Sequence, residues 1–124
     1  MATSSAGFHE AEDHLTSGTR DMHRALVSLM EELEAVDWYQ QRIEATEDGG
    51  LRAILEHNRD EEKEHAAMVL EWIRRNDPIF EARLREYLFT EGTIVGREAA
   101  LMNRDNVVRR REPSTSVGSL RGGG

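Results

Sequence analysis

One segment of the chain carries a carboxylate and an imidazole at a spacing that suits a shared metal ion. Glu62 and His65 form a Glu-x-x-His pair, and two such residues on a helix lie about 60° apart around the axis and one turn apart along it. The pair interrupts the inward row of a predicted amphipathic helix, which runs in steps of four and three residues: Leu51, Leu55, Asn58, Glu62, His65, Val69 and Trp72. A buried carboxylate and imidazole without partners would be strongly destabilising. We therefore expect this row to offer them a ligand.

An earlier segment carries a matching row with one carboxylate, Glu32, in its middle. This row follows the same steps of four and three residues: Ala25, Leu29, Glu32, Val36, Tyr39 and Ile43. Bundles with di-iron carboxylate sites take a Glu from each of two helices and a Glu-x-x-His from each of the other two. This chain supplies one of each, which is half of such a ligand set. Its donors are oxygen and nitrogen only, and they suit Fe(II), Mn(II) or Zn(II).

The composition indicates one small domain that buries part of its surface against a partner. The chain has 124 residues, of which 38% are hydrophobic and 32% charged, and its net charge is −8. An acidic protein is not expected to bind nucleic acid and favours cations instead. No apolar run is long enough to span a bilayer, so we expect no membrane association. The chain has no cysteine, which excludes a disulfide framework and a thiolate metal site and fits a cytoplasmic protein.

The hydrophobic pattern predicts two long helices and no strand. We expect disorder over residues 1–7, then a helix that begins between Phe8 and Thr19 and ends near Thr46. Residues 47–50 (EDGG) predict a turn in which a glycine adopts the left-handed conformation that ends a helix. A second helix is predicted from about Leu51 to Arg75. Two long helices joined by a short turn should pack as an antiparallel hairpin.

Shorter elements are expected after the hairpin. Asn76 or Asp77 can cap a third helix over residues 79–89, which Gly92 ends, and a weaker fourth helix is predicted over residues 93–102. We thus expect a helical domain over residues 8–102 and a flexible tail over residues 103–124. A hairpin cannot cover its own inward rows, so the all-α fold should be half of a four-helix bundle that dimerisation completes.

The same residues resemble the encapsulated ferritins, a branch of the ferritin-like superfamily. The resemblance covers nearly the whole chain. It is most specific over residues 30–39 (MEELEAVDWY), 57–66 (HNRDEEKEHA), 70–72 (LEW) and 87–91 (YLFTE). It implies a ferroxidase that oxidises Fe(II) to Fe(III) at a di-iron centre between two subunits. It also implies a homo-oligomer in which such dimers form a ring, with a decamer expected.

The resemblance assigns roles to individual residues. It implies that Glu32, Glu62 and His65 of each subunit hold the metal and that Tyr39 lies nearby. A second set, Glu31, Glu34 and Trp38, would mark a route or holding site for incoming metal. Other divalent metals such as Zn, Mn or Ca are expected to occupy these sites as well. All of these positions match the family pattern.

The C-terminal end resembles a second feature of the family. Residues 116–121 (SVGSLR) are similar to the short peptide by which cargo proteins dock inside an encapsulin shell. Val117 and Leu120 are apolar anchors in an otherwise polar segment. The residues before them would act as a tether that raises the effective concentration near the shell wall. The resemblance therefore implies a location in the cytoplasm, inside an encapsulin nanocompartment, with mineral storage in its lumen.

Simpler interpretations exist for several of these residues. Glu62 and His65 could be an ion pair on a charged helix face, since residues 60–64 (DEEKE) are all charged. Tyr39 and Trp38 are more often packing residues than metal contacts. For the protein as a whole, two other functions stay open: a helical dimer in which metal only joins the subunits, and a di-iron oxidase that acts on another substrate.

Overall fold

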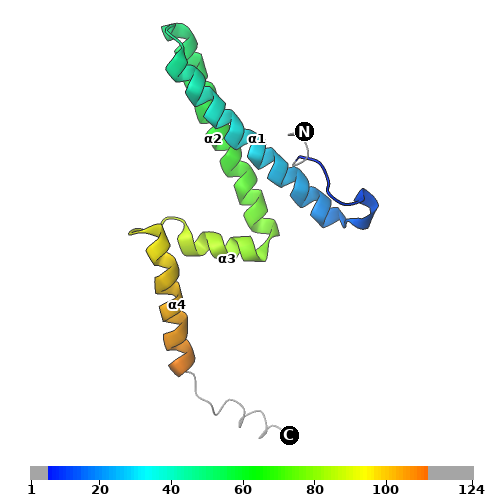
Figure 1. Ribbon diagram of the computed structural model, residues 1–124, viewed down its shortest axis with the longest axis vertical. Helices are drawn as coiled ribbons and strands as arrows, with labels where there is room; N and C mark the ends of the chain where they lie inside the picture. The colour runs from blue at the N-terminus through cyan, green and yellow to red at the C-terminus, as the bar shows by residue number, and fades with distance from the viewer. Residues whose placement is uncertain (1–5, 112–124) are drawn as a thin grey trace, which may run out of the picture. The chain divides into compact units, whose positions relative to one another are not determined.

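The computed structural model describes residues 6–111 of the chain (Figure 1). The expected disorder of residues 1–5 and the proposed docking peptide at residues 116–121 lie outside this range. Within it the chain is all-α, as predicted, and the elements are η2 (Glu12–His14), α1 (Ser17–Ala45), α2 (Gly49–Asn76), α3 (Pro78–Tyr87) and α4 (Ile94–Arg111). None of the described helices is both long and apolar enough to cross a membrane.

Helices α1 and α2 form the predicted hairpin (Figure 1). Helix α1 begins at Ser17 because the Thr16 hydroxyl oxygen accepts a hydrogen bond from the backbone N–H of Thr19 at 3.1 Å. Gly18 lies within the first turn and does not break the helix. The start of α1 therefore falls inside the predicted interval between Phe8 and Thr19.

The turn between α1 and α2 differs from the prediction. Gly49 and Gly50 do not end α1 in a left-handed conformation; they are the first residues of α2. The carboxylate of Asp48 accepts a hydrogen bond from the N–H of Gly50 at 3.1 Å and so caps α2. Thr46, which follows α1, is extended, and its N–H still bonds the carbonyl of Arg42. The side-chain cap makes a left-handed glycine unnecessary here.

The core of the hairpin is small. Among the described residues, the buried hydrophobic side chains are those of Ile43, Ala66 and Ile73. The predicted row on α1 is half-buried up to Tyr39 and buried at Ile43. The row on α2 is half-buried in its middle, but its ends are more open, with Leu51 44% and Trp72 40% exposed. One chain thus leaves its inward rows partly uncovered, as expected of half a bundle.

Helices α3 and α4 depart from the predicted boundaries. Asp77 caps α3 as predicted, because its carboxylate accepts from the N–H groups of Ile79 and Phe80 at 3.0 and 2.9 Å. Helix α3 ends at Tyr87, before the predicted end, since Phe89 is left-handed with φ 59°. Gly92 is also left-handed (φ 84°) but stands outside the helix. The described residues divide into two compact units between Glu81 and Ala82.

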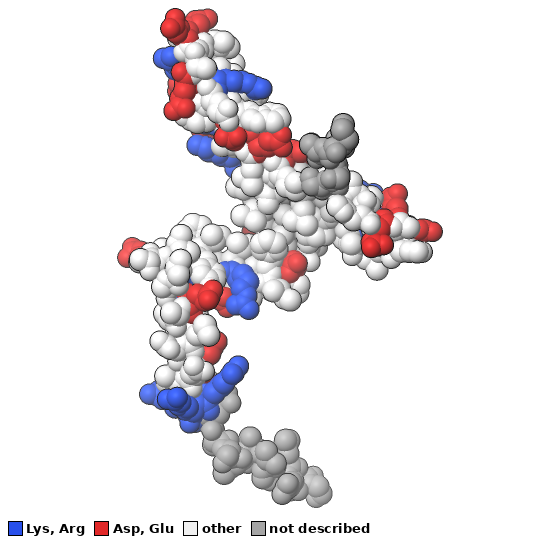
Figure 2. Space-filling view, in the orientation of Figure 1, with Lys and Arg blue, Asp and Glu red and all other residues white. Residues whose placement is uncertain are grey.

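Helix α4 is longer than the predicted fourth helix. It runs to Arg111 and therefore passes residue 102, where we expected a flexible tail to begin. The Thr93 hydroxyl oxygen accepts from the N–H of Gly96 at 3.1 Å and caps its first turn. Three arginines fill the last turn, where their charge interacts favourably with the negative end of the helix dipole. Figure 2 shows these basic side chains gathered at the C-terminal end of α4.

Candidate metal centre

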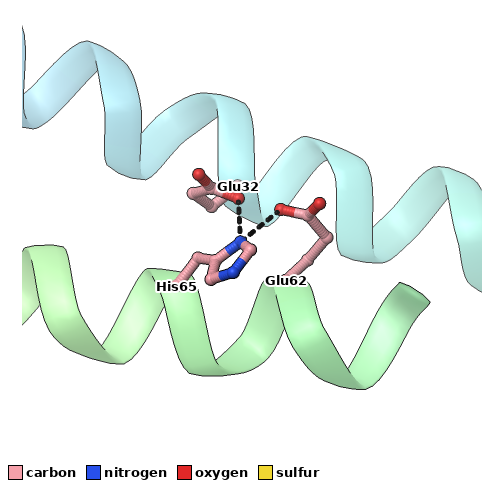
Figure 3. Close-up of side chains that lie close together, drawn as sticks. All are labelled: Glu32, Glu62 and His65. Atoms are coloured by element: carbon pink, nitrogen blue, oxygen red, sulfur yellow. Dashed lines mark ion pairs between the residues drawn. The ribbon is translucent and has the colours of Figure 1, made fainter. Parts of the chain in front are cut away.

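The backbone of the hairpin places the three predicted ligands at the same position along its length. Glu62 and His65 are three residues apart on α2 and therefore point to the same side of that helix. Glu32 lies on α1, which packs against α2. Figure 3 shows the three side chains converging in the space between the two helices. Because α1 and α2 are antiparallel, residues from distant parts of the sequence meet here.

The distances within this cluster are short. The Nδ1 atom of His65 lies 3.5 Å from Oε2 of Glu62 and 3.7 Å from Oε2 of Glu32. One ligand atom from each residue lies within 4.8 Å of the other two. Within the described residues, no other group of three or more His, Asp or Glu side chains meets this condition. The geometry is that of a three-donor cluster rather than of a single ion pair.

The donor set fits a divalent transition metal. Two atoms that bind one ion at about 2.1 Å are at most about 4.2 Å apart, and both distances from His65 are within that limit. The carboxylates of Glu32 and Glu62 are mostly covered, with 25% and 23% of their side chains exposed, whereas His65 is 43% exposed. The open side leaves room for ligands from a second chain. Two carboxylates and one imidazole are half of the set that a di-iron carboxylate site uses.

A fourth side chain, which the sequence analysis did not place at the site, lies beside the ring of His65. The second ring nitrogen of His65, Nε2, lies 4.0 Å from Oε2 of Glu61. Glu61 also lies 3.6 Å from Nε2 of His57. A carboxylate beside the free nitrogen of a metal-binding imidazole is a common arrangement that fixes the ring. The spacing of four residues between Glu61 and His65 was the available signal.

The remaining predicted residues lie apart from this cluster. Tyr39 is half-buried on α1, and the guanidinium of Arg42 lies over its ring at 5.6 Å. Glu31 and Glu34 are exposed, and Trp38 is 49% exposed. In the described part of a single chain, Glu31 and Glu34 do not join a group of three ligands. Their predicted roles in metal entry stay predictions.

The family follows from comparison with known proteins. Residues 7–91 match the EncFtn-like family. The chain is 62% identical over 100 residues to an encapsulated ferritin-like protein of Rhodospirillum rubrum, a match that spans 81% of this chain and 71% of that protein. The chain therefore belongs to the EncFtn-like family of encapsulated ferritin-like proteins. The resemblance inferred from the sequence is confirmed.

Other relatives are similar to this chain over different lengths. A ferritin-like protein of Thermotoga maritima is 59% identical over 87 residues, which is 70% of this chain and 76% of that protein. An encapsulin nanocompartment cargo protein of Myxococcus xanthus is 34% identical over 125 residues, 92% of this chain and 95% of the relative. A crystal structure of a Nitrosomonas europaea protein is 62% identical and superposes with a TM-score of 0.69, covering 71% of this chain and 97% of that one.

Proposed function

We propose that this protein is a ferroxidase that oxidises Fe(II) to Fe(III) at a di-iron site formed between two copies of the chain. The observation that carries the proposal is the convergence of Glu32, Glu62 and His65 across the α1–α2 hairpin. Two such clusters, facing each other across a two-fold axis, would provide four carboxylates and two imidazoles. That is the ligand set of a di-iron carboxylate bundle.

Iron is the substrate in this proposal. Each of two Fe(II) ions gives up one electron, and one dioxygen molecule accepts the pair together with two protons from water, which gives hydrogen peroxide. Glu32 and Glu62 supply negative charge that favours the more highly charged Fe(III) product. His65 supplies a nitrogen donor, and Glu61, 4.0 Å from its second ring nitrogen, would favour one orientation of the ring. Tyr39, on the same row of α1 as Glu32, is proposed as a nearby aromatic contact.

Exposed acidic residues on α1 are proposed to guide iron toward the site. Glu31 and Glu34 lie three residues apart and are exposed, so both carboxylates can attract a hydrated cation. Trp38, one turn farther along α1, is 49% exposed and would form the apolar edge of that route. The same residues are expected to accept Zn, Mn or Ca, because oxygen ligands do not discriminate strongly among these ions.

The product is proposed to accumulate inside an encapsulin shell. The Myxococcus xanthus relative is named as an encapsulin nanocompartment cargo protein and the Rhodospirillum rubrum relative as encapsulated. Residues 116–121 supply a candidate docking peptide. An assembly of dimers in a ring, for which a decamer is proposed, has no closed interior. The mineral would therefore form in the lumen of the shell, within the cytoplasm.

The experiment that tests the function adds Fe(II) anaerobically to the purified protein and then admits air. A ferroxidase should consume oxygen, develop Fe(III) absorbance and release iron as mineral faster than the protein-free buffer does. If iron binds but is not oxidised, the protein is a dimer in which the metal only joins the two subunits. Oxygen consumption that needs an added organic substrate would identify a different di-iron oxidase. Either result would contradict the proposed function.

A further inference from the structure

Polar side chains on α2 connect that helix to α1 at successive levels of the hairpin. Nearest the turn, Arg52 donates from Nε to the carbonyl of Ile43 at 3.3 Å and from Nη2 to that of Thr46 at 2.5 Å. Farther from the turn, Arg59 donates from Nη1 to the side-chain oxygen of Gln40 at 2.8 Å. These contacts lie on the turn side of the metal cluster.

The next contact between the helices is the ion pair of His65 with Glu32 at 3.7 Å. From Gln40 to Glu32 on α1 the paired positions move away from the turn, as they do from Arg59 to His65 on α2, which is the order of an antiparallel pair of helices. The contact of Arg59 with Gln40 therefore belongs to the same register that brings His65 to Glu32. A change of register would break both.

The apolar side chains alone specify this register weakly. The buried hydrophobic residues in the described chain are two isoleucines and one alanine, and the alanine, Ala66, lies next to His65. The three residues between α1 and α2 and the two hydrogen bonds of Arg52 fix the helices near the turn. Farther along, a rotation or shift of α2 would exchange one set of apolar contacts for another. The same movement would leave polar groups without partners, and this is how a polar pair specifies the pairing of packed helices.

Arg59 is held firmly enough to set the register. Its side chain is only 21% exposed, and Nε also donates to Oδ1 of Asp60 at 3.0 Å. The planar fork of an arginine can serve both partners at once, whereas a lysine ammonium is a single point charge.

We propose that Arg59 is a positioning residue: by holding Gln40, it sets the register of α2 against α1 and keeps Glu32 within reach of Glu62 and His65. The identity of the ion that the cluster binds rests on the proposed function. The positioning role of Arg59 does not, because the pairing of the helices can be measured without iron. Arg59 itself touches no metal ligand in this account and acts through the backbone of α2.

The test compares four full-length variants with the wild type. Arg59→Met removes both hydrogen bonds and keeps the aliphatic length of the side chain. Gln40→Met removes only the acceptor on α1 and leaves the bond of Arg59 to Asp60. Gln40→Glu restores an acceptor. Arg24→Met is the matched control, since Arg24 makes its ion pair with Asp21 within α1.

Two measurements avoid iron turnover. The first is anaerobic titration with Co(II), followed by its visible absorption. The second is the distance between spin labels at Glu44→Cys on α1 and Ala67→Cys on α2, both exposed positions in a chain without natural cysteine. Labelled chains are diluted into an excess of unlabelled ones, so that distances within one chain dominate. Circular dichroism reports whether each variant keeps its helix content.

Arg59→Met and Gln40→Met should bind Co(II) at least about tenfold more weakly, the usual effect of losing a group that orients metal ligands. Their label distances should broaden or shift relative to those of the wild type. Gln40→Glu and Arg24→Met should behave as the wild type. Electrostatics alone predicts the opposite for Arg59→Met, because removing a cation beside an acidic site should strengthen metal binding.

Several outcomes would overturn the proposal. Wild-type Co(II) affinity and label distances in folded Gln40→Met would do so, and so would equal losses in the Arg24→Met control. If Arg59→Met loses its helix content, the comparison of Gln40→Met with Gln40→Glu decides. A wild-type protein that binds Co(II) but fails to oxidise Fe(II) would contradict the proposed function and leave the positioning role of Arg59 intact.

Discussion

Glu32 and His65 face each other across the hairpin at 3.7 Å, although they belong to different helices. Both come from one chain, so a single copy brings three candidate ligands together. In the proposed function a second copy supplies the other three. Binding of iron and pairing of chains are therefore expected to depend on each other.

Replacing Glu32, Glu62 or His65 singly by Ala should lower the rate of Fe(II) oxidation at least about 100-fold, because even partners outside the ligand shell are worth about 10- to 100-fold in metal affinity or activity. Helix content should be unchanged, since all three side chains are partly exposed. Oxygen uptake and Fe(III) absorbance give the rate. Glu64→Ala and His57→Ala are matched controls from exposed positions on α2. Full activity in all three variants would contradict the assignment of these residues as metal ligands.

Adding Fe(II) without oxygen should convert small species into larger assemblies. In the absence of metal, the Glu32 and Glu62 carboxylates of two facing chains repel each other, and a bound cation removes that repulsion. Native mass spectrometry or light scattering, with and without a chelator, measures the change. The Glu62→Ala variant should respond more weakly to metal. A mass distribution that neither metal nor chelator alters would contradict the prediction.

Deleting residues 114–124 should leave Fe(II) oxidation by the isolated protein intact and abolish its packaging. This segment lies outside the described residues, so the prediction rests on the two apolar anchors Val117 and Leu120. Their burial could contribute on the order of 3–5 kcal/mol before ordering costs, so firm loading needs many tails per assembly. The test is co-expression with the cognate shell protein and measurement of the cargo-to-shell ratio. An unchanged cargo-to-shell ratio for the truncated protein would show that residues 114–124 do not direct packaging.

Acid should weaken the C-terminal part of α2. The pKa of Glu71 is lowered from 4.5 to about 2, chiefly because Arg74 and then Arg75 donate hydrogen bonds to its carboxylate. A lowered pKa in the folded state stabilises the fold above the unfolded value, and this contribution is lost as the pH falls from about 4.5 toward 2. Thermal melts of the wild type and Glu71→Gln should differ by a constant amount above this window and converge within it. A constant difference in melting temperature between the two proteins down to the lowest pH would contradict a stabilising role for the Glu71 carboxylate.

Replacing Asp48 by Ala should destabilise the hairpin by about 1 kcal/mol, the usual cost of losing a side-chain N-cap. The carboxylate of Asp48 accepts from the N–H of Gly50, and two glycines at the start of a helix depend on such a cap. Asp48→Asn should recover most of the loss, because its amide oxygen can accept the same bond. Urea unfolding followed by circular dichroism gives the difference. Equal midpoints for Asp48→Ala and the wild type would mean that the cap contributes nothing.

The hairpin and the three-residue cluster could be predicted because long amphipathic helices fix which residues share a face. The polar interruptions at Glu32, Glu62 and His65 then stand out against apolar neighbours. Helix ends were harder to predict, because a glycine can stand at the start of a helix or just after its end. At Gly49 the side-chain cap from Asp48 makes it the start of α2. The left-handed conformation of Phe89 has no signal in its residue type. The role of Arg59 depends on which residue it faces across the hairpin, which periodicity within one helix does not specify.

The small core of the described residues, made of Ile43, Ala66 and Ile73, links the stability of this protein to its abundance. A chain that buries so little can gain further stability mainly by association, and that gain grows with the concentration of free chains. The melting temperature should therefore rise with protein concentration, and dilution should unfold the chain as well as separate it. In the proposed assembly, a newly made copy without a partner would be the form most exposed to proteases, and pairing would also protect the protein from degradation.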